Sequence, residues 1–286
     1  MDRSLLLPVT IMSLGMLLIP FGDTAGKMMT SAGVAPFFVA WTRYLFGLIL
    51  LAPFALRPSA LKLLTDWRIW VRSAIQTFTI VTILTALQTE PIANVFGAFF
   101  LGPMVSYLLS VWLLREQGSA ARIILLAIGL GGVFLVVKPG FGMTPGIGWA
   151  LLSGCFYGMF LTASRWVAPL GKPIHLLLTQ LIVGTLLLTP FGLSYLPPIT
   201  PSISGLVLWS AAASMLGNLF LVLAYARAGA SILAPFVYVQ LVGATLYGVV
   251  FFNTVPDAVA ALGLAIIFLS GFATLFLKSR PKPPAP

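Results

Sequence analysis

Three charged side chains lie inside otherwise apolar segments of the chain. Asp23 and Lys27 are one helical turn apart near the end of the first such segment, and Arg43 lies well inside the second. If these segments cross a membrane, each buried charge costs about 3 kcal/mol on insertion scales, so it serves a function or belongs to an ion pair. An acid and two bases suit a structural or gating ion network, and they equally suit direct contact with a zwitterionic solute. Both interpretations stay open.

Two apolar segments also carry helix-breaking residues. Segment 92–114 contains Gly97 and Pro103, and segment 230–252 contains Pro235. Proline removes a backbone hydrogen bond and frees carbonyl groups, which lipid tolerates only where protein or a cavity satisfies them. Such interrupted helices, when they occupy equivalent positions in two halves of a chain, are a sequence indication of a binding site. A kink that serves packing alone is the alternative.

Polar and aromatic side chains around these interruptions could line a solute cavity, because a small-metabolite site needs an apolar pocket with a few placed polar groups. The predicted substrate-binding residues are Asp23, Arg43, Gln76, Thr79, Asn94, Phe99, Tyr107, Tyr157, Asn218, Tyr238, Gln240 and Tyr247. The predicted gating or hinge residues are Lys27, Gly97, Pro103, Glu116 and Pro235. For Glu116, an ion pair with Arg115 or Arg122 is an equal alternative.

The composition indicates which type of secondary structure must position these residues. Of 286 residues, 59% are hydrophobic and only 8% are charged, too few charges to cover a soluble globule of this size. The segments are apolar all round, which favours membrane-spanning helices over a β-barrel. The net charge of +10 then indicates lipid headgroups and topology rather than nucleic acid. We expect no metal and no cofactor.

The sequence predicts an all-α integral membrane protein with ten transmembrane helices. The expected spans are 5–26, 35–56, 70–89, 92–114, 121–138, 146–166, 174–196, 203–225, 230–252 and 257–277. With this count, thirteen of the sixteen basic residues fall on one side, against only Lys27 and Lys138 on the other. Short basic loops stay in the cytoplasm, so we expect both termini inside, in a bacterial inner membrane.

The two halves of the chain resemble each other. The segment that begins at Ala86 matches the segment that begins at Ala224, and similar offsets relate two further pairs of motifs. We therefore expect repeats of five helices at 1–139 and 140–278, followed by a disordered cytoplasmic tail at 279–286. An odd number of spans per repeat makes the second repeat inverted, which is the architecture of many secondary transporters.

Several motifs, in order, resemble the drug/metabolite transporter superfamily, in its branch with two EamA-type domains. They are FGDTAGK in the first span, WTRYLFGLILLAPF in the second, EPIANV before the fourth, LLRE ending at Glu116, and GLAIIFLSG in the last. The second copy departs from the first at Thr254, which stands at the position of Glu116, and at Gln180, which falls near that of Arg43. The resemblance covers nearly the whole chain.

This resemblance implies a secondary transporter of small organic metabolites, most often amino acids or their derivatives, by export or facilitated exchange. An uptake permease for a vitamin, a nucleoside or an S-adenosylmethionine-like metabolite is the alternative. A membrane-embedded enzyme is disfavoured because the chain has one His and six acidic residues, and a channel because its plan is a duplicated single chain. The expected partners are the small-molecule substrate and the lipid bilayer, with the protein a monomer or weak dimer.

Overall fold

The computed structural model describes residues 3–115, 119–139, 143–228 and 233–274, and all regular elements in these ranges are helical. They are α1 (Arg3–Ser31), α2 (Pro36–Ala55), α3 (Pro58–Leu61), η1 (Lys62–Thr65), α4 (Trp67–Leu87), α5 (Ile92–Phe99), α6 (Leu101–Leu113), α7 (Ala120–Val137), α8 (Pro145–Val167), η2 (Ala168–Leu170), α9 (Pro173–Ser194), α10 (Pro201–Tyr225), η3 (Ala234–Tyr238), α12 (Val239–Phe252) and α13 (Ala258–Ala273).

Among the described residues, eight helical segments are long and apolar enough to cross a membrane, with α5 and α6 counted together. Two further apolar helices, Phe236–Phe252 and Ala258–Ala273, are shorter. The chain is therefore a multi-span membrane protein, and its helices follow the ten expected spans closely. The largest differences are in α1, which continues to Ser31, and in α4, which begins at Trp67. Both extensions place charged residues inside helices rather than in connections.

Proline and capping side chains define where several helices begin. The helices α2, α8, α9 and α10 each start with a proline, whose missing N–H falls where helical donors have no partner in any case. Thr144 and Thr200 cap α8 and α10 by accepting backbone N–H groups through their hydroxyls. Asp66 and Asp257 cap α4 and α13 by accepting backbone N–H groups through their carboxylates. The same residue types that interrupt apolar runs thus fix the ends of the helices.

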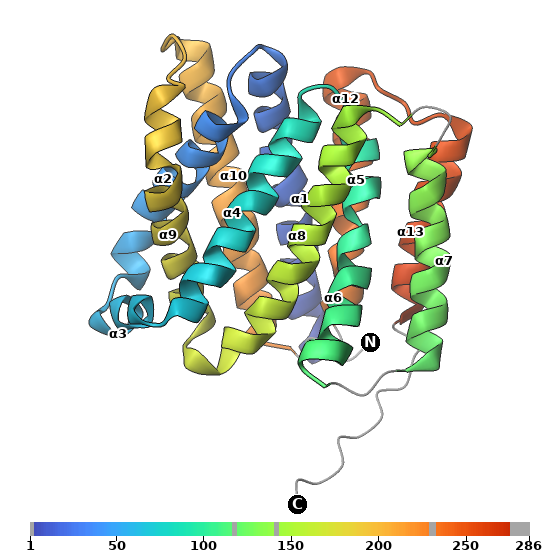
Figure 1. The fold of residues 1–286 in the computed structure, drawn as a ribbon, viewed down its shortest axis with the longest axis horizontal. Coiled ribbons are helices and arrows are strands. Elements are labelled where there is room, and N and C mark those ends of the chain that lie inside the picture. Colours follow the sequence, from blue (N-terminus) through green and yellow to red (C-terminus); the bar gives the residue numbers. More distant parts are fainter. Residues whose placement is uncertain (1–2, 116–118, 140–142, 229–232, 275–286) are drawn as a thin grey trace, which may run out of the picture.

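The helices pack in a pattern that is unchanged when the first five spans are exchanged with the last five. The helix α1 packs along α10 and α12, just as α8 packs along α4 and the α5–α6 pair. The α2–α10 contact matches the α9–α4 contact, while α2 packs on α9 and α7 packs on α13. Figure 1 shows α2 and α9 at one edge of the bundle and α7 and α13 at the other. We call the lower edge of that view, where α1 begins and α3 lies, the α3 side.

The fourth and ninth spans are both broken, as the sequence predicts. The break between α5 and α6 is at Phe100, and Pro103 lies in the first turn of α6. Pro235 lies in the 3-10 helix η3, which precedes α12. Each proline therefore occupies the start of a helical piece, where its missing N–H leaves few carbonyls without a donor.

The helices α7 and α13 touch through glycine. A methyl group added at Gly132 would lie 2.7 Å from the carbonyl oxygen of Gly263, and one added at Gly263 would lie 2.6 Å from that of Gly132. At the end of this pair away from the α3 side, Lys138 Nζ lies 2.5 Å from Asp257 Oδ2. Hydrogen bonds from Lys138 and from the backbone N–H of Ala260 hold the pKa of Asp257 below its ordinary value. The ammonium group and the N-terminus of α13 thus stabilise the same carboxylate.

The glycine contact generates the first prediction. We expect Gly132→Ala to lower the free energy of unfolding by about 1–3 kcal/mol, because the added methyl group overpacks the α7–α13 contact. The matched control is Gly131→Ala, since a methyl group there meets nothing within 4 Å. Thermal unfolding of the purified variants in detergent measures both. Equal melting temperatures for the two variants would contradict the close contact.

Candidate functional site

A cavity lies among α1, α2, α4, α9 and α10, within the membrane-spanning bundle. Its volume is about 70 Å³, which is room for a few water molecules. The lining residues come from the middle of α1, α4 and α10 and from the first turns of α9, so the cavity lies between the middle of the bundle and the α3 side. They are Ile19, Asp23, Arg43, Tyr44, Gln76, Ile80, Leu177, Gln180, Leu181, Ser214, Met215 and Asn218.

An ion pair forms one end of this cavity. Arg43 Nη1 lies 2.5 Å from Asp23 Oδ1, and both side chains are at least 94% buried. The same guanidinium group donates to Ser210 Oγ at 2.7 Å and to the Gly22 carbonyl at 3.0 Å. Ser210 Oγ in turn donates to the Gly22 carbonyl. The pair therefore joins α1, α2 and α10, and its charges compensate each other inside the bundle.

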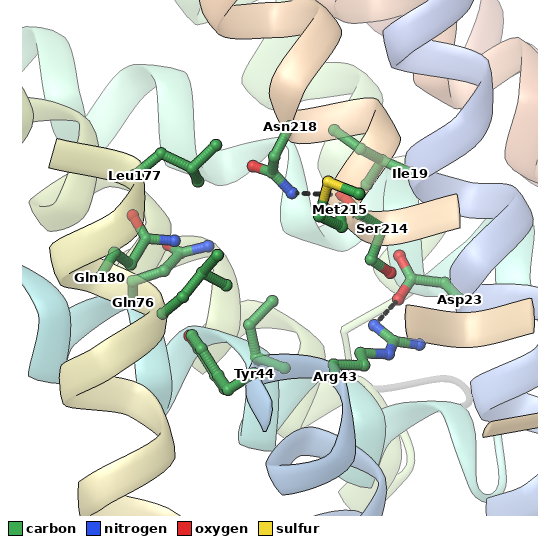
Figure 2. A pocket seen from close by; sticks show the side chains of 12 residues that line it. Ile19, Asp23, Arg43, Tyr44, Gln76, Leu177, Gln180, Ser214, Met215 and Asn218 are labelled. Carbon is green, nitrogen blue, oxygen red and sulfur yellow. Dashed lines mark hydrogen bonds and ion pairs between the residues drawn. The ribbon is translucent and has the colours of Figure 1, made fainter. Parts of the chain in front are cut away.

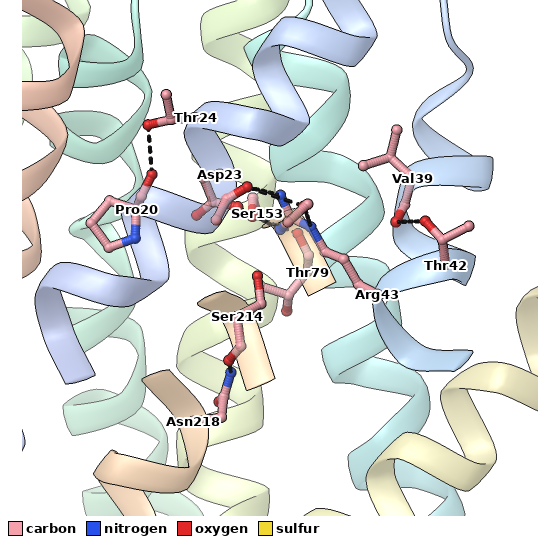
Figure 3. Close-up of polar contacts among 12 residues, drawn as sticks. Pro20, Asp23, Thr24, Val39, Thr42, Arg43, Thr79, Ser153, Ser214 and Asn218 are labelled. Atoms are coloured by element: carbon pink, nitrogen blue, oxygen red, sulfur yellow. Dashed lines mark hydrogen bonds and ion pairs between the residues drawn. The ribbon is translucent and has the colours of Figure 1, made fainter. Parts of the chain in front are cut away.

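Two glycines on α1 allow this close approach. A methyl group at Gly26 would overlap the Arg43 guanidinium, and one at Gly22 would meet Ser210 O and Ser214 Oγ. Their one-turn spacing leaves a smooth strip along α1 on which the guanidinium lies and against which α10 packs. The FGDTAGK motif thus supplies both the acid and the surface on which its partner lies (Figure 3).

The other end of the cavity is formed by two amides. Figure 2 shows Gln76 of α4 and Gln180 of α9 side by side, across the cavity from Asp23 and Arg43. Gln76 Oε1 is buried and has no hydrogen-bond partner among the described residues, and the same holds for Ser214 Oγ next to the ion pair. Asn218 donates through Nδ2 to the Ser214 carbonyl at 2.8 Å. The cavity therefore has a charged end and a neutral, hydrogen-bonding end.

Lys27 does not join the Asp23–Arg43 pair. Its Nζ instead donates to the carbonyls of Leu87 and Glu90, at 2.8 and 2.6 Å, and lies 5.4 Å from the ring centre of Phe252. The Glu90 carboxylate accepts a hydrogen bond from the Thr144 hydroxyl, at the start of α8. Lys27 therefore ties α1 to the α4–α5 connection at the end opposite the α3 side, a position consistent with a gating contact.

Four of the twelve predicted substrate residues line the cavity, namely Asp23, Arg43, Gln76 and Asn218. The others lie elsewhere. Phe99 packs on Tyr157 with ring centres 4.5 Å apart, where α5 meets α8. Thr79 is buried on α4, and its carbonyl accepts a hydrogen bond from Ser153 Oγ of α8.

The remaining predicted residues lie around α7, α12 and η3. Tyr107 accepts the backbone N–H of Ser119 just before α7. Tyr238 stacks on Phe100 at 4.8 Å and lines a second, smaller cavity of about 20 Å³. Tyr247 belongs to an aromatic cluster on α1, α10 and α12.

Asn94 Oδ1 and Gln240 Nε2 are buried and have no hydrogen-bond partner in the part of the chain that the structure describes. Neither side chain lines the two cavities described above. They remain candidates for a polar site that is separate from the first cavity.

The predicted hinge residues have mixed positions. A methyl group at Gly97 would run into Val136 and Leu264, so this glycine lets α5 pack against α7 and α13. Pro103 and Pro235 lie in the broken spans described above, and Glu116 lies outside the described residues.

Sequence reasoning missed Tyr44, Ser210, Ser214 and the placement of Gln180 against Gln76. Serines at a spacing of one helical turn on α10 carry a usable signal, because they face the Gly22 and Gly26 strip. The amide pair carries no local signal, since it forms only when α4 and α9 pack.

Comparison with known proteins agrees with this architecture. The EamA-like transporter family matches the chain twice, over residues 6–138 and 144–276. The chain therefore belongs to the EamA family of the drug/metabolite transporter superfamily, whose members are transporters. The sequence resemblance to this family is confirmed.

Relatives with recorded functions transport different solutes. The chain is 26% identical to the S-adenosylmethionine uptake transporter of Rickettsia prowazekii, over 84% of this chain and 82% of the relative. It is 27% identical to the pseudopaline exporter CntI of Pseudomonas aeruginosa, over 71% of this chain and 72% of the relative. It is 26% identical to the riboflavin transporter of Rhizobium johnstonii, over 83% and 79%. None of these three relatives is named as an amino-acid transporter.

A solved crystal structure shares the fold. The match covers 94% of this chain and 96% of the solved chain, with a TM-score of 0.67 and 21% sequence identity. At this identity the likeness concerns the fold alone.

The buried ion pair generates a second prediction. We expect Asp23→Asn and Arg43→Gln each to lower the free energy of unfolding by about 3–5 kcal/mol, because each leaves one buried group uncompensated. The double variant should lose less free energy of unfolding than the two single variants lose together, because it removes both charges at once. Thermal unfolding of the four proteins gives the coupling. Strict additivity would show that the two side chains do not interact.

Proposed function

We propose that this protein is a secondary transporter of small organic metabolites that carry an amino-acid-like zwitterionic group, and that the cavity between the ion pair and the amide pair binds the substrate. The observation that carries the proposal is a set of buried polar atoms on cavity-lining residues that have no hydrogen-bond partner among the described residues. Gln76 Oε1 and Ser214 Oγ are two of them. An unsatisfied buried polar group costs about 1–3 kcal/mol, and a bound polar solute relieves that cost.

The two ends of the cavity support a substrate with two kinds of polar group. Asp23 and Ser214 offer acceptors and a hydroxyl for an ammonium group, while Gln76 and Gln180 offer donors and acceptors for a neutral polar group. Apolar surface from Ile19, Leu177 and Met215 lies between them. This arrangement fits the general form of a metabolite pocket, which is mostly apolar with a few placed polar groups.

The architecture for transport is two inverted repeats of five spans, at residues 1–139 and 140–278. The helix packing that survives exchange of the two halves supports this proposal, and so do the two consecutive family matches. The bias of basic residues supports both termini in the cytoplasm of a bacterial cell, so the α3 side is the cytoplasmic side.

Alternating access follows from this plan. A cavity of about 70 Å³ is too small for a metabolite, so substrate entry must spread its lining. Rocking of one half against the other does this, with the breaks at Phe100 and before α12 absorbing the change.

An uptake permease for a larger metabolite, such as a vitamin or an S-adenosylmethionine-like compound, is the second candidate. The relatives that transport S-adenosylmethionine and riboflavin favour it. The amide pair suits it too, because Gln76 and Gln180 can hydrogen-bond the edge of a heterocycle. Since one relative is an exporter, direction is left to experiment.

Counterflow in liposomes tests the function. Purified protein, reconstituted with unlabelled solute inside, should accumulate the same labelled solute from outside with saturable kinetics. The panel is the common amino acids, S-adenosylmethionine and riboflavin. Linear, unsaturable flux would indicate a channel instead, and no flux of any member would contradict the proposed substrate class.

The amide pair generates a third prediction. We expect Gln76→Leu to raise the KM of counterflow about tenfold or more, because it removes both hydrogen-bonding atoms from the cavity. The matched control is Gln240→Leu, which changes another buried glutamine outside this cavity. A larger loss for Gln240→Leu would move the substrate site to the broken spans.

A further inference from the structure

Arg72 is a buried cation that forms no ion pair within the described residues. It is 7% exposed, although it lies on α4, a membrane-spanning helix. Its Nε donates to Ser164 Oγ at 2.9 Å, and its Nη1 donates to the Leu176 carbonyl at 3.2 Å. Its guanidinium lies 4.8 Å from the ring centre of Phe160. All three partners are neutral, so no contact among the described residues compensates the charge.

The other buried cations near the cavity are placed differently. Arg43 is compensated by Asp23 at 2.5 Å. Lys27 is bound by two carbonyls at the opposite end of α1, where Glu90 is the nearby acid. A charge in a low-dielectric interior is costly unless it is paired, so an anion in this region gains most by approaching Arg72.

Arg72 lies next to the cavity, on its α3 side. It precedes Gln76 by one helical turn, so the two side chains project from the same face of α4. Leu176, whose carbonyl it contacts, directly precedes Leu177 of the cavity lining. Arg72 therefore lies on the stretch of α4 between the cavity and the α3 side.

We propose that Arg72 binds the anionic group of the substrate, as a second subsite at the mouth of the cavity on the α3 side. The substrate class is an organic zwitterion whose carboxylate pairs with Arg72 while its ammonium group lies toward Asp23 and Ser214. Arg43 is not available to this carboxylate, because its Nε, Nη1 and Nη2 already donate to Ser210, Asp23 and the Gly22 carbonyl. Within the described residues Asp23 accepts through Oδ1, which leaves Oδ2 for an ammonium group. The inference rests on the proposed function, since it assigns one end of the same substrate path.

A purely structural role for Arg72 makes a different prediction. If it only ties α4 to Ser164 of α8 and to the Leu176 carbonyl of α9, its removal lowers thermal stability but leaves ligand preference unchanged. An anion subsite instead makes the discrimination between carboxylates and neutral amides depend on residue 72. The ligand preference, rather than the melting temperature alone, therefore separates the two roles.

The test measures ligand-induced thermal shifts of the full-length protein in detergent. The probes are L-methionine, L-glutamine and L-phenylalanine, each compared with its carboxamide, which keeps the ammonium group and lacks the carboxylate. A ligand of the native state raises the melting temperature according to its affinity. The variants are Arg72→Gln and Arg72→Lys, and the control is Arg68→Gln. Arg68 lies one turn away on the same helix, and its guanidinium pairs with Asp66.

We expect at least one of the amino acids to stabilise the wild type, Arg72→Lys and Arg68→Gln, and its amide to have little effect. In Arg72→Gln, the apparent Kd for that amino acid should rise about ten- to a hundredfold, the effect of losing a hydrogen bond to a charged group.

Equal stabilisation of wild type and Arg72→Gln overturns the proposal, as does equal stabilisation by an amino acid and its amide. No shift with any of the three amino acids overturns it too. In that last case, counterflow of S-adenosylmethionine would leave the proposed transport function standing, and counterflow of riboflavin would favour the second candidate function. Loss of counterflow for every solute, together with carboxylate binding at Arg72, would contradict the transport function alone.

Discussion

The structure depends on one constraint, which is that polar groups inside a membrane must be satisfied by the protein itself. Arg43 shows how this is done. Its three nitrogens donate to a carboxylate, a serine hydroxyl and a helix carbonyl, on two different helices. The acid comes from α1, the hydroxyl from α10, and the carbonyl from Gly22, which is exposed to the guanidinium because glycine has no side chain. One buried cation therefore determines which three helices meet and how closely α1 and α10 approach.

The same constraint makes the cavity informative. In a bundle whose polar groups were all satisfied, a polar solute would find no unpaired buried group with which to form a new hydrogen bond. Here Gln76 Oε1 and Ser214 Oγ have no hydrogen-bond partner within the described part of the chain, while Asp23 and Arg43 compensate each other. Gln76 and Ser214 line a space that is too small for a metabolite. Such a cavity can accept a solute only when its lining opens, which links binding to a change in conformation.

The sequence predicts most of the fold because a membrane span is specified locally, by the length of an apolar run. It identifies the Asp23–Arg43 region for the same reason, since a charge inside such a run is conspicuous. The amide pair and Ser210 could not be predicted, because they depend on which helices pack together. The sequence places Arg72 inside the expected span 70–89 and, by charge, on the side with most of the basic residues. Its contacts with α8 and α9 could not be predicted, because they too depend on helix packing. Phe99 and Tyr238 adjoin the broken spans, as expected, but contact α8 and Phe100 rather than the larger cavity.

An aromatic cluster beside the ion pair has a consequence for spectroscopy. Trp209 directly precedes Ser210, which accepts a hydrogen bond from Arg43, and its ring lies 4.7 Å from that of Phe21, the neighbour of Gly22. The indole Nε1 is buried and has no hydrogen-bond partner within the described residues. Its emission therefore depends on the polarity of the α1–α10 contact and on whether water reaches it. The protein carries an intrinsic fluorophore at the place where its two halves would have to separate, so each opening of that contact changes the colour of the emitted light.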